Sequence, residues 1–83
     1  MASFDRNETK NKVIDIVVAE LKIDKSKVTD AAQLTDLGAD SLSLLEIIFQ
    51  LEEQFGIEIP DEDAERMKTL NDVVEYVQIR RSK

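Results

Sequence analysis

The chain has 83 residues, of which 42% are hydrophobic and 35% charged, so residues 1–83 are expected to form one globular domain with a small core. It contains no cysteine and no histidine, which excludes disulfides, thiolate metal sites and catalysis that pairs a serine or cysteine with histidine. No apolar run is long enough to cross a membrane and the start lacks a secretory signal, so we expect a cytoplasmic protein.

The acidic charge is concentrated in the middle of the chain, although the net charge of the whole is only −7. Residues 28–65 contain eleven acidic and no basic side chains, whereas residues 1–27 contain six bases and five acids, and residues 66–83 five bases and two acids. Such a surface repels nucleic acid and anionic lipid and attracts basic proteins. The alternative, that acidity only keeps the protein soluble, does not account for its confinement to one block.

The first predicted helix begins at residues 5–7 and ends at residues 21–22. Its apolar residues recur three and four positions apart, as on one face of a helix; they are Ile14, Val17, Val18 and Leu21, with Phe4 expected to dock beneath them. From residue 23 to residue 39 this periodicity fades, and so long a connection is unusual in a compact domain. We expect its apolar residues Val28, Leu34 and Leu37 to point inward, with a short helical turn near Asp30–Leu34.

The second predicted helix, Ser41 to about Phe55, has two apolar faces. At about 100° per residue, one uncharged face, expected to be the core face, contains Leu44, Ile47, Ile48, Leu51 and Phe55. The other contains Leu42, Leu45 and Phe49, flanked by Glu46, Glu52 and Glu53. Apolar side chains among carboxylates suit a protein-docking surface, whereas a helix wrapped on most sides would bury carboxylates at high cost. We therefore favour docking, with Leu45 partly in the core.

The remaining elements are short. Gly56 is expected to end the second helix in a left-handed conformation, and residues 57–59 to form an extended connector with inward isoleucines. Pro60 and the three acids after it predict a short third helix, against which Ala64 and Met67 pack. Thr69 and Asp72 have the spacing of a capping box. The last helix that follows has the core residues Leu70, Val73, Val74 and Val77, and the C-terminal bases Arg80, Arg81 and Lys83.

The turn at residues 36–42 places a serine where the second helix begins. Gly38 permits the sharp turn, and Asp40 and Ser41 are both frequent N-cap residues. A hydroxyl at a helix N-terminus is a place where a phosphate is electrostatically favoured. As a nucleophile Ser41 lacks a partner base, because residues 28–65 contain no lysine or arginine, so a hydrolase is set aside. The simplest alternative is that Ser41 only caps the helix.

Four motifs in fixed order favour a more specific interpretation. They are D-L-G-A-D-S-L at 36–42, L-E at 45–46, L-E-E-Q-F at 51–55 and I-E-I-P-D at 57–61. D-S-L alone is a weak pattern, but the set at these spacings, in a chain of this size and charge, strongly resembles the acyl carrier proteins. In that family the serine of D-S-L carries 4′-phosphopantetheine, whose terminal thiol holds an acyl chain as a thioester. The resemblance implies that Ser41 is the attachment site and that Asp40 supports the modification.

The resemblance also implies the fold, the activity and the partners. The fold would be all-α, a small four-helix bundle of three longer helices and one short helix with a long first loop. The protein would be a monomeric carrier and not an enzyme, shuttling growing acyl chains between the enzymes of fatty-acid biosynthesis. Its partners would be a phosphopantetheinyl transferase, which is the holo-carrier synthase, and biosynthetic enzymes with basic docking patches.

Two sets of residues follow from the same comparison. The expected partner contacts are Leu42, Glu46, Phe49, Glu52, Glu53, Ile59, Asp61 and Glu65. The expected lining of an acyl pocket beneath the serine, between the second and third helices, is Leu45, Ile48, Phe49, Leu51, Ile59, Ala64 and Met67. Ser43 and Phe49 depart from the acid and the Met or Val usual in fatty-acid carriers, which puts the pathway in question.

Two alternatives remain open from the sequence. Within the family, the cargo could belong to a specialised lipid, a polyketide or an aminoacyl group. Outside it, the chain could be an acidic helical adaptor for a basic protein. No specific metal site is expected, because the acidic clusters lack the spacing of a calcium-binding loop, although they could bind divalent cations weakly.

Overall fold

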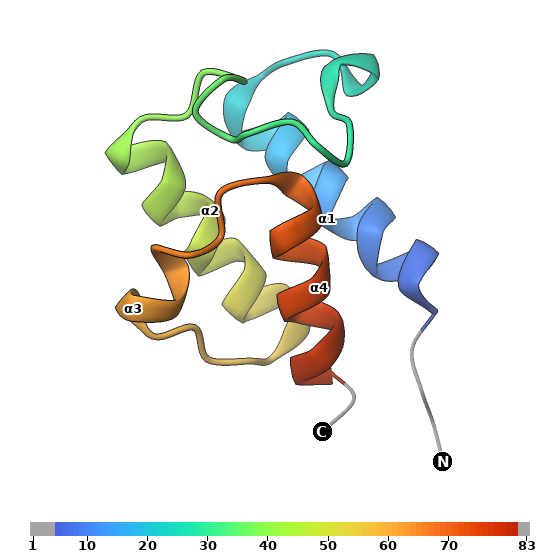
Figure 1. Cartoon of the computed structure of the whole chain (residues 1–83), viewed down its shortest axis with the longest axis vertical. Helices are drawn as coiled ribbons and strands as arrows, with labels where there is room; N and C mark the ends of the chain where they lie inside the picture. Colours follow the sequence, from blue (N-terminus) through green and yellow to red (C-terminus); the bar gives the residue numbers. More distant parts are fainter. Residues whose placement is uncertain (1–4, 82–83) are drawn as a thin grey trace.

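The computed structural model describes residues 5–81 as a bundle of helices (Figure 1). Its elements are α1 (Arg6–Leu21), the 3-10 helix η1 (Lys25–Lys27), α2 (Ser41–Phe55), α3 (Asp61–Ala64) and α4 (Leu70–Arg81). In the described residues the only β-type pairing is an isolated bridge between Gln33 and Thr69. The predicted all-α fold, with three longer helices, one short helix and a long first loop, is confirmed.

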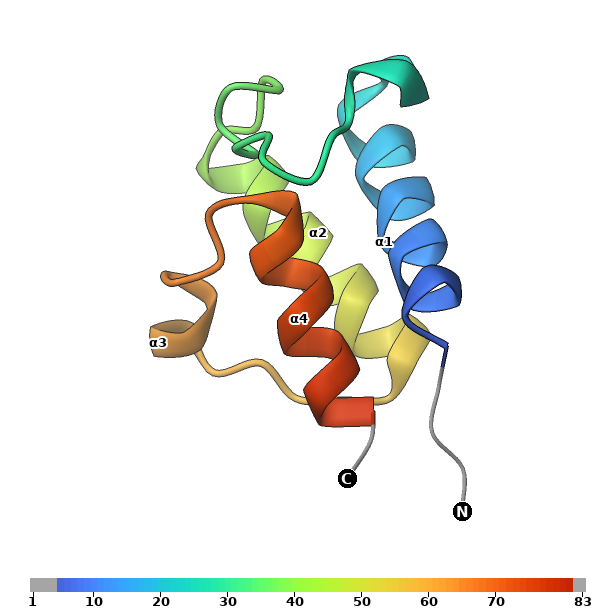
Figure 2. The same ribbon diagram turned by 45° about the vertical axis from the view of Figure 1, so that its right-hand side comes forward.

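The three long helices pack around one apolar core. α1 contacts both α2 and α4 and runs antiparallel to them, while α3 lies to the side of α2 and α4 (Figures 1 and 2). Among the predicted core residues, Val17, Leu51, Leu70 and Val77 are fully buried, at 0% exposure. Phe4 and Lys83, which were expected in the core and at a helix end, lie outside the described residues.

The helix ends follow local capping rules. Asp5 precedes α1 and its carboxylate accepts the N–H of Asn7 at 2.9 Å. Gly56 ends α2 with a φ of 65°, the left-handed conformation predicted for it. The predicted capping box of α4 forms in both directions: Thr69 Oγ1 accepts the N–H of Asp72 at 3.1 Å, and Asp72 Oδ2 accepts the N–H of Thr69 at 3.2 Å.

The helical turn predicted at Asp30–Leu34 is wrong. The turn lies earlier, at η1, where the Asp24 carboxylate accepts the N–H of Ser26 at 3.2 Å. Residues 30–34 instead bond to the segment that enters α4: the N–H of Leu34 donates to the Lys68 carbonyl and that of Leu70 to the Ala32 carbonyl, both at 2.9 Å. Locally, the N–H of Ala32 donates to the Thr29 carbonyl at 3.1 Å, which makes a single turn and not a helix. The Leu34 N–H and the Ala32 carbonyl are used between distant segments.

Candidate functional site

Ser41 is the first residue of α2 and not its cap. The cap is Asp40, whose Oδ1 accepts the N–H of Ser43 at 2.8 Å. This hydrogen bond is the main reason that the pKa of the Asp40 carboxyl lies below its ordinary value. The Ser41 side chain is exposed, and its hydroxyl forms no hydrogen bond with any residue in 5–81. At the start of α2, a hydroxyl without a hydrogen bond in residues 5–81 therefore lies next in sequence to a carboxylate that is hydrogen-bonded as the helix cap.

The turn before α2 is fixed by backbone hydrogen bonds of Gly38 and of the residue that follows it. Gly38 has a φ of 103°, which an L-residue rarely adopts, and its N–H donates to the Thr35 carbonyl at 3.1 Å. Ala39, the next residue, is 7% exposed and its N–H donates to the Leu34 carbonyl at 3.1 Å. A buried anchor two residues before Ser41 thus holds the exposed serine at a defined place on the bundle.

A cavity of about 560 Å³ opens beside Ser41. Its apolar lining comes from the long loop, from α2, from the end of α3 and the segment after it, and from α4. It consists of Leu34, Leu44, Ile47, Ile48, Leu51, Ala64, Met67 and Val73. Its polar lining consists of Gln33, Thr35, Ser41, Glu65 and Lys68. An apolar cavity with a few polar groups is the usual form of a small-molecule site, and here a free hydroxyl belongs to its wall.

The structure brings together part of the set that was expected to line an acyl pocket. Ile48, Leu51, Ala64 and Met67 all line this cavity. Leu45, Phe49 and Ile59 do not line it. Leu45 and Phe49 are exposed on another face of α2, and Ile59, within the connector, is buried at 5% exposure but lies outside the cavity lining. The contributions of Gln33, Thr35 and Lys68 were not predicted, because the pairing of the long loop with the segment before α4 is not a local property of the chain.

A lysine that lines the same cavity does not make Ser41 a catalytic nucleophile. Lys68 shares the cavity wall with Ser41, but no hydrogen bond joins their side chains. A general base must lie within hydrogen-bonding reach of the hydroxyl that it activates. This arrangement can hold a covalently attached group, but the described residues offer no base positioned to attach it.

Comparison with known proteins agrees with this arrangement. Residues 11–77 match the family described as "Phosphopantetheine attachment site". Over 68 residues the chain is 50% identical to an acyl carrier protein of Bdellovibrio bacteriovorus, and the match covers 81% of this chain and 87% of that protein. The chain belongs to the acyl carrier protein family. Such proteins are carriers and not enzymes, and the cofactor of this domain is 4′-phosphopantetheine.

The fold leads to the same family. The structure is similar to the solution structure of a proposed acyl carrier protein from Anaplasma phagocytophilum, with a TM-score of 0.84 and 32% sequence identity. The similarity covers 95% of this chain and 94% of that one. No helix within residues 5–81 is long and apolar enough to span a membrane.

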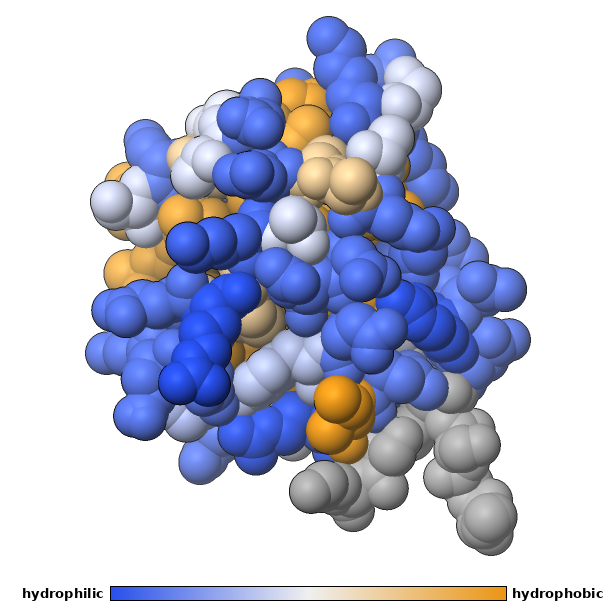
Figure 3. Space-filling model, viewed as in Figure 1, coloured by the Kyte–Doolittle hydropathy of each residue, from blue (hydrophilic) through white to orange (hydrophobic). Residues whose placement is uncertain are grey.

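α2 presents an apolar face to solvent. Leu42, Leu45 and Phe49 are 66%, 48% and 56% exposed, and Glu46 and Glu53 beside them are exposed as well. Hydrophobic side chains gather at the left edge of the molecule, over α2, among otherwise hydrophilic atoms (Figure 3). The prediction that Leu45 is partly in the core is wrong, because Leu44 and Ile48 take the inward positions on that helix.

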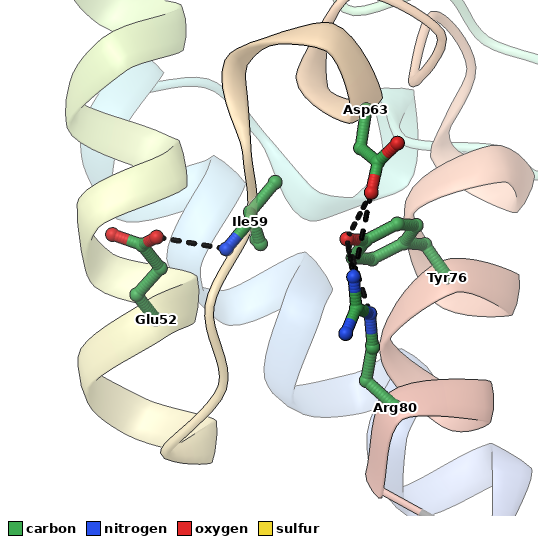
Figure 4. A network of polar contacts seen from close by, with 5 residues as sticks. All are labelled: Glu52, Ile59, Asp63, Tyr76 and Arg80. Atoms are coloured by element: carbon green, nitrogen blue, oxygen red, sulfur yellow. Dashed lines mark hydrogen bonds and ion pairs between the residues drawn. The ribbon is translucent and has the colours of Figure 1, made fainter.

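Two residues predicted to contact partners are used inside the protein. Ile59 is buried, as expected for an inward isoleucine of the connector, so it has no surface to offer. The half-buried Glu52 accepts the Ile59 N–H through Oε2 at 2.9 Å and so fixes the connector to α2 (Figure 4). The other predicted contacts at the surface, Asp61 and Glu65, are exposed.

The acidic residues do not form a recognisable metal centre. Within the part of the chain that the structure describes, no three histidine, cysteine or carboxylate residues are grouped as metal ligands. The acidic side chains of the 28–65 block are instead distributed over the long first loop, α2, the connector, α3 and the residue after it, and most of them are exposed. Any divalent cation would meet them as a diffuse negative surface.

Proposed function

We propose that Ser41 carries 4′-phosphopantetheine, and that the protein holds growing acyl chains on it as thioesters and shuttles them between enzymes of fatty-acid biosynthesis. One observation supports this more than any other: the Ser41 hydroxyl is exposed, free of hydrogen bonds within residues 5–81, and part of the wall of an apolar cavity. A chain attached there has an apolar space within its reach.

The attachment is a phosphoryl transfer from coenzyme A. The Ser41 oxygen forms a bond to the phosphorus next to the pantetheine, the bond from that phosphorus to the adenosine bisphosphate breaks, and the hydroxyl proton passes to a base. Since no base within residues 5–81 is hydrogen-bonded to Ser41, a separate transferase supplies it. The N-terminus of α2 favours the new phosphodiester electrostatically, and Asp40 supports the reaction by holding this end of the helix in shape.

The test is intact mass spectrometry after incubation with coenzyme A, Mg²⁺ and a broadly tolerant phosphopantetheinyl transferase. We expect one 4′-phosphopantetheine increment on the wild type and none on Ser41→Ala. Ser43→Ala is the matched control: it removes a hydroxyl two residues away but keeps the backbone N–H that Asp40 accepts, so it should be modified like the wild type. Absence of the increment from the wild type, or its persistence in Ser41→Ala, would contradict the proposal.

Partner docking is proposed for the exposed face of α2 and the acids near it. The residues are Leu42, Glu46, Phe49, Glu53, Asp61 and Glu65. Exposed apolar groups supply contact area, and the acids attract basic enzymes, so binding should weaken as salt rises. The partners are the transferase and the biosynthetic enzymes, whose contacts must also be released quickly for handover.

Phe49→Ala tests this docking surface. We expect it to weaken binding of the transferase about tenfold, because a large exposed aromatic is a frequent centre of an interface, and to leave the melting temperature nearly unchanged. Ile79→Ala is the control, since Ile79 is equally exposed, at 56%, but lies on α4. Isothermal titration calorimetry or surface plasmon resonance measures both. Equal losses in the two variants would mean that α2 has no special part in docking.

A further inference from the structure

α3 is too short to be stable through its own backbone hydrogen bonds. It has only four residues, it follows Pro60, and no side chain caps its N-terminus. A helix of this length has almost no stability of its own. It nevertheless leads into one wall of the cavity beside Ser41, because Ala64 is its last residue and Met67 follows three residues later. Whatever holds α3 in place therefore determines where that wall stands.

A three-residue side-chain network ties α3 to α4 (Figure 4). The Tyr76 hydroxyl donates to Asp63 Oδ2 at 2.7 Å, and its oxygen accepts from Arg80 Nη2 at 2.8 Å and Nε at 3.1 Å. The Arg80 guanidinium also lies 3.4 Å from Asp63 Oδ2 and 5.1 Å from the centre of the Tyr76 ring. We call Asp63, Tyr76 and Arg80 the α3 latch.

The hydrogen bonds of Tyr76 should hold the latch closed at neutral pH. Burial, followed by the hydrogen bond to Asp63, raises the pKa of the Tyr76 phenol, so the hydroxyl keeps its proton and remains a donor at neutral pH. Hydrogen bonds to charged groups are stronger than neutral ones. By contrast, the Asp63–Arg80 ion pair is partly exposed and long, and such pairs contribute little alone. Tyr76 is therefore the residue on which the latch depends.

We propose that the α3 latch positions the wall formed by Ala64 and Met67, and thereby sets how well the protein shields an acyl chain in the cavity. The effect on cargo rests on the proposed carrier function of Ser41, whereas the latch itself does not. With the latch closed, α3 is held against α4 and the wall is fixed. With the latch broken, α3 loses its side-chain hydrogen bonds to α4. It keeps the packing of Ala64 and Met67 against the core, the connection through Ile59 and Glu52 and the bond from Leu34 to Lys68, so the wall stays folded but opens more often.

The first experiment measures the latch on the unmodified protein. Amide hydrogen exchange followed by NMR reports local opening residue by residue. In Tyr76→Phe, which keeps the ring and removes the hydroxyl, and in Asp63→Ala, we expect amides of residues 63–67 to exchange about fivefold faster than in the wild type. Amides in the middle of α1 and α4 should not change. Glu62→Ala is the matched control, since it removes a carboxylate from the same helix that has no partner in residues 5–81.

The second experiment measures the effect on cargo. Wild type and Tyr76→Phe, each carrying the phosphopantetheine arm and the same medium-length saturated acyl chain, are treated with hydroxylamine, and cleavage of the thioester is followed by mass spectrometry. We expect about fivefold faster cleavage in Tyr76→Phe, and no change in Glu62→Ala.

The outcomes separate the latch from the carrier proposal. Unchanged exchange at residues 63–67, or faster exchange throughout the bundle, would overturn the latch even in a protein that accepts the arm normally. Faster local exchange with unchanged thioester cleavage would overturn its role in shielding cargo. If Ser41 failed to accept the arm, the proposed function would fail, and the exchange experiment would still decide whether the latch holds α3.

Discussion

Two neighbouring side chains at the start of α2 differ in their hydrogen bonding. The Asp40 carboxylate is committed to the Ser43 N–H at 2.8 Å, whereas the Ser41 hydroxyl has no hydrogen bond within the described chain. Because Asp40 satisfies the helix N-terminus, Ser41 is not needed as a cap and remains available for modification. The same pair of residue types in the reverse roles would have hidden the hydroxyl in a capping bond.

The Asp40 cap should give the stability of the protein a specific dependence on pH. The pKa of Asp40 is lower in the folded protein than its ordinary value of 3.8, chiefly because of the Ser43 N–H. Its contribution is therefore fully present above pH 3.8 and is lost as the pH falls through the lower, folded pKa. We expect Asp40→Ala to melt at a lower temperature than the wild type at neutral pH, with the difference shrinking in strong acid.

Thermal melting followed by circular dichroism measures this difference. Asp36→Ala is the control, because Asp36 is an exposed carboxylate in the same turn with no contact of this kind in the described residues. At neutral pH, Asp36→Ala should not show the decrease in melting temperature that is expected for Asp40→Ala. A difference between wild type and Asp40→Ala that is equal at neutral and strongly acidic pH would show that the carboxylate does not act through its ionised form.

At the scale of elements, the chain relies on caps at helix ends and on side chains that tie short segments to long ones. α4 begins with a reciprocal capping box, and at the same place the Leu70 and Asn71 N–H groups donate to carbonyls of the long first loop, both at 2.9 Å. The start of α4 thus supports both its own helix and the loop that leads to Ser41. A defect there should affect the fold more than its exposed position suggests.

Thr69→Ala tests the contribution of this capping box. Loss of the Thr69 hydroxyl leaves the Asp72 N–H without its acceptor, so we expect the free energy of unfolding to fall by about 1 kcal/mol. Urea unfolding at equilibrium measures it. Thr29→Ala is the control, because Thr29 is exposed and has no such side-chain bond within residues 5–81. Equal stability of Thr69→Ala and the wild type would show that the box adds nothing to the helix.

At the scale of the whole molecule, the acidic block is poorly compensated. Residues 28–65 contain eleven acids, and within residues 5–81 only Asp30 and Asp63 of these form ion pairs, with Lys10 and Arg80. Repulsion among the rest opposes the compact state. The surface that attracts basic partners is therefore also a source of instability in the free protein.

Millimolar Mg²⁺ should raise the melting temperature at low ionic strength, because the cation screens this repulsion. The increase should exceed that produced by sodium chloride at the same ionic strength. Differential scanning calorimetry with and without Mg²⁺ measures it. Unchanged melting would mean that repulsion within the block does not limit stability.

Local sequence signals were sufficient to predict the four helices, most of their ends and the candidate serine. Each of these depends on neighbours within about four residues: the spacing of Ile14 and Val17, the left-handed Gly56, and the Thr69–Asp72 box. Such signals hold whatever the rest of the chain does. The motifs around Ser41 are equally local, since the turn, the cap and the serine follow one another directly along the chain.

The features that join distant segments depend on how the bundle closes. Helix periodicity does not indicate that Glu52 bonds to the Ile59 N–H and is thereby withdrawn from the docking face. Nor does it indicate that residues 30–34 pair with the entry to α4, or that the Tyr76 hydroxyl donates to Asp63, thirteen positions away. In each case a backbone or side-chain polar group found its partner only in the packed bundle, because buried polar groups must be paired wherever a partner lies.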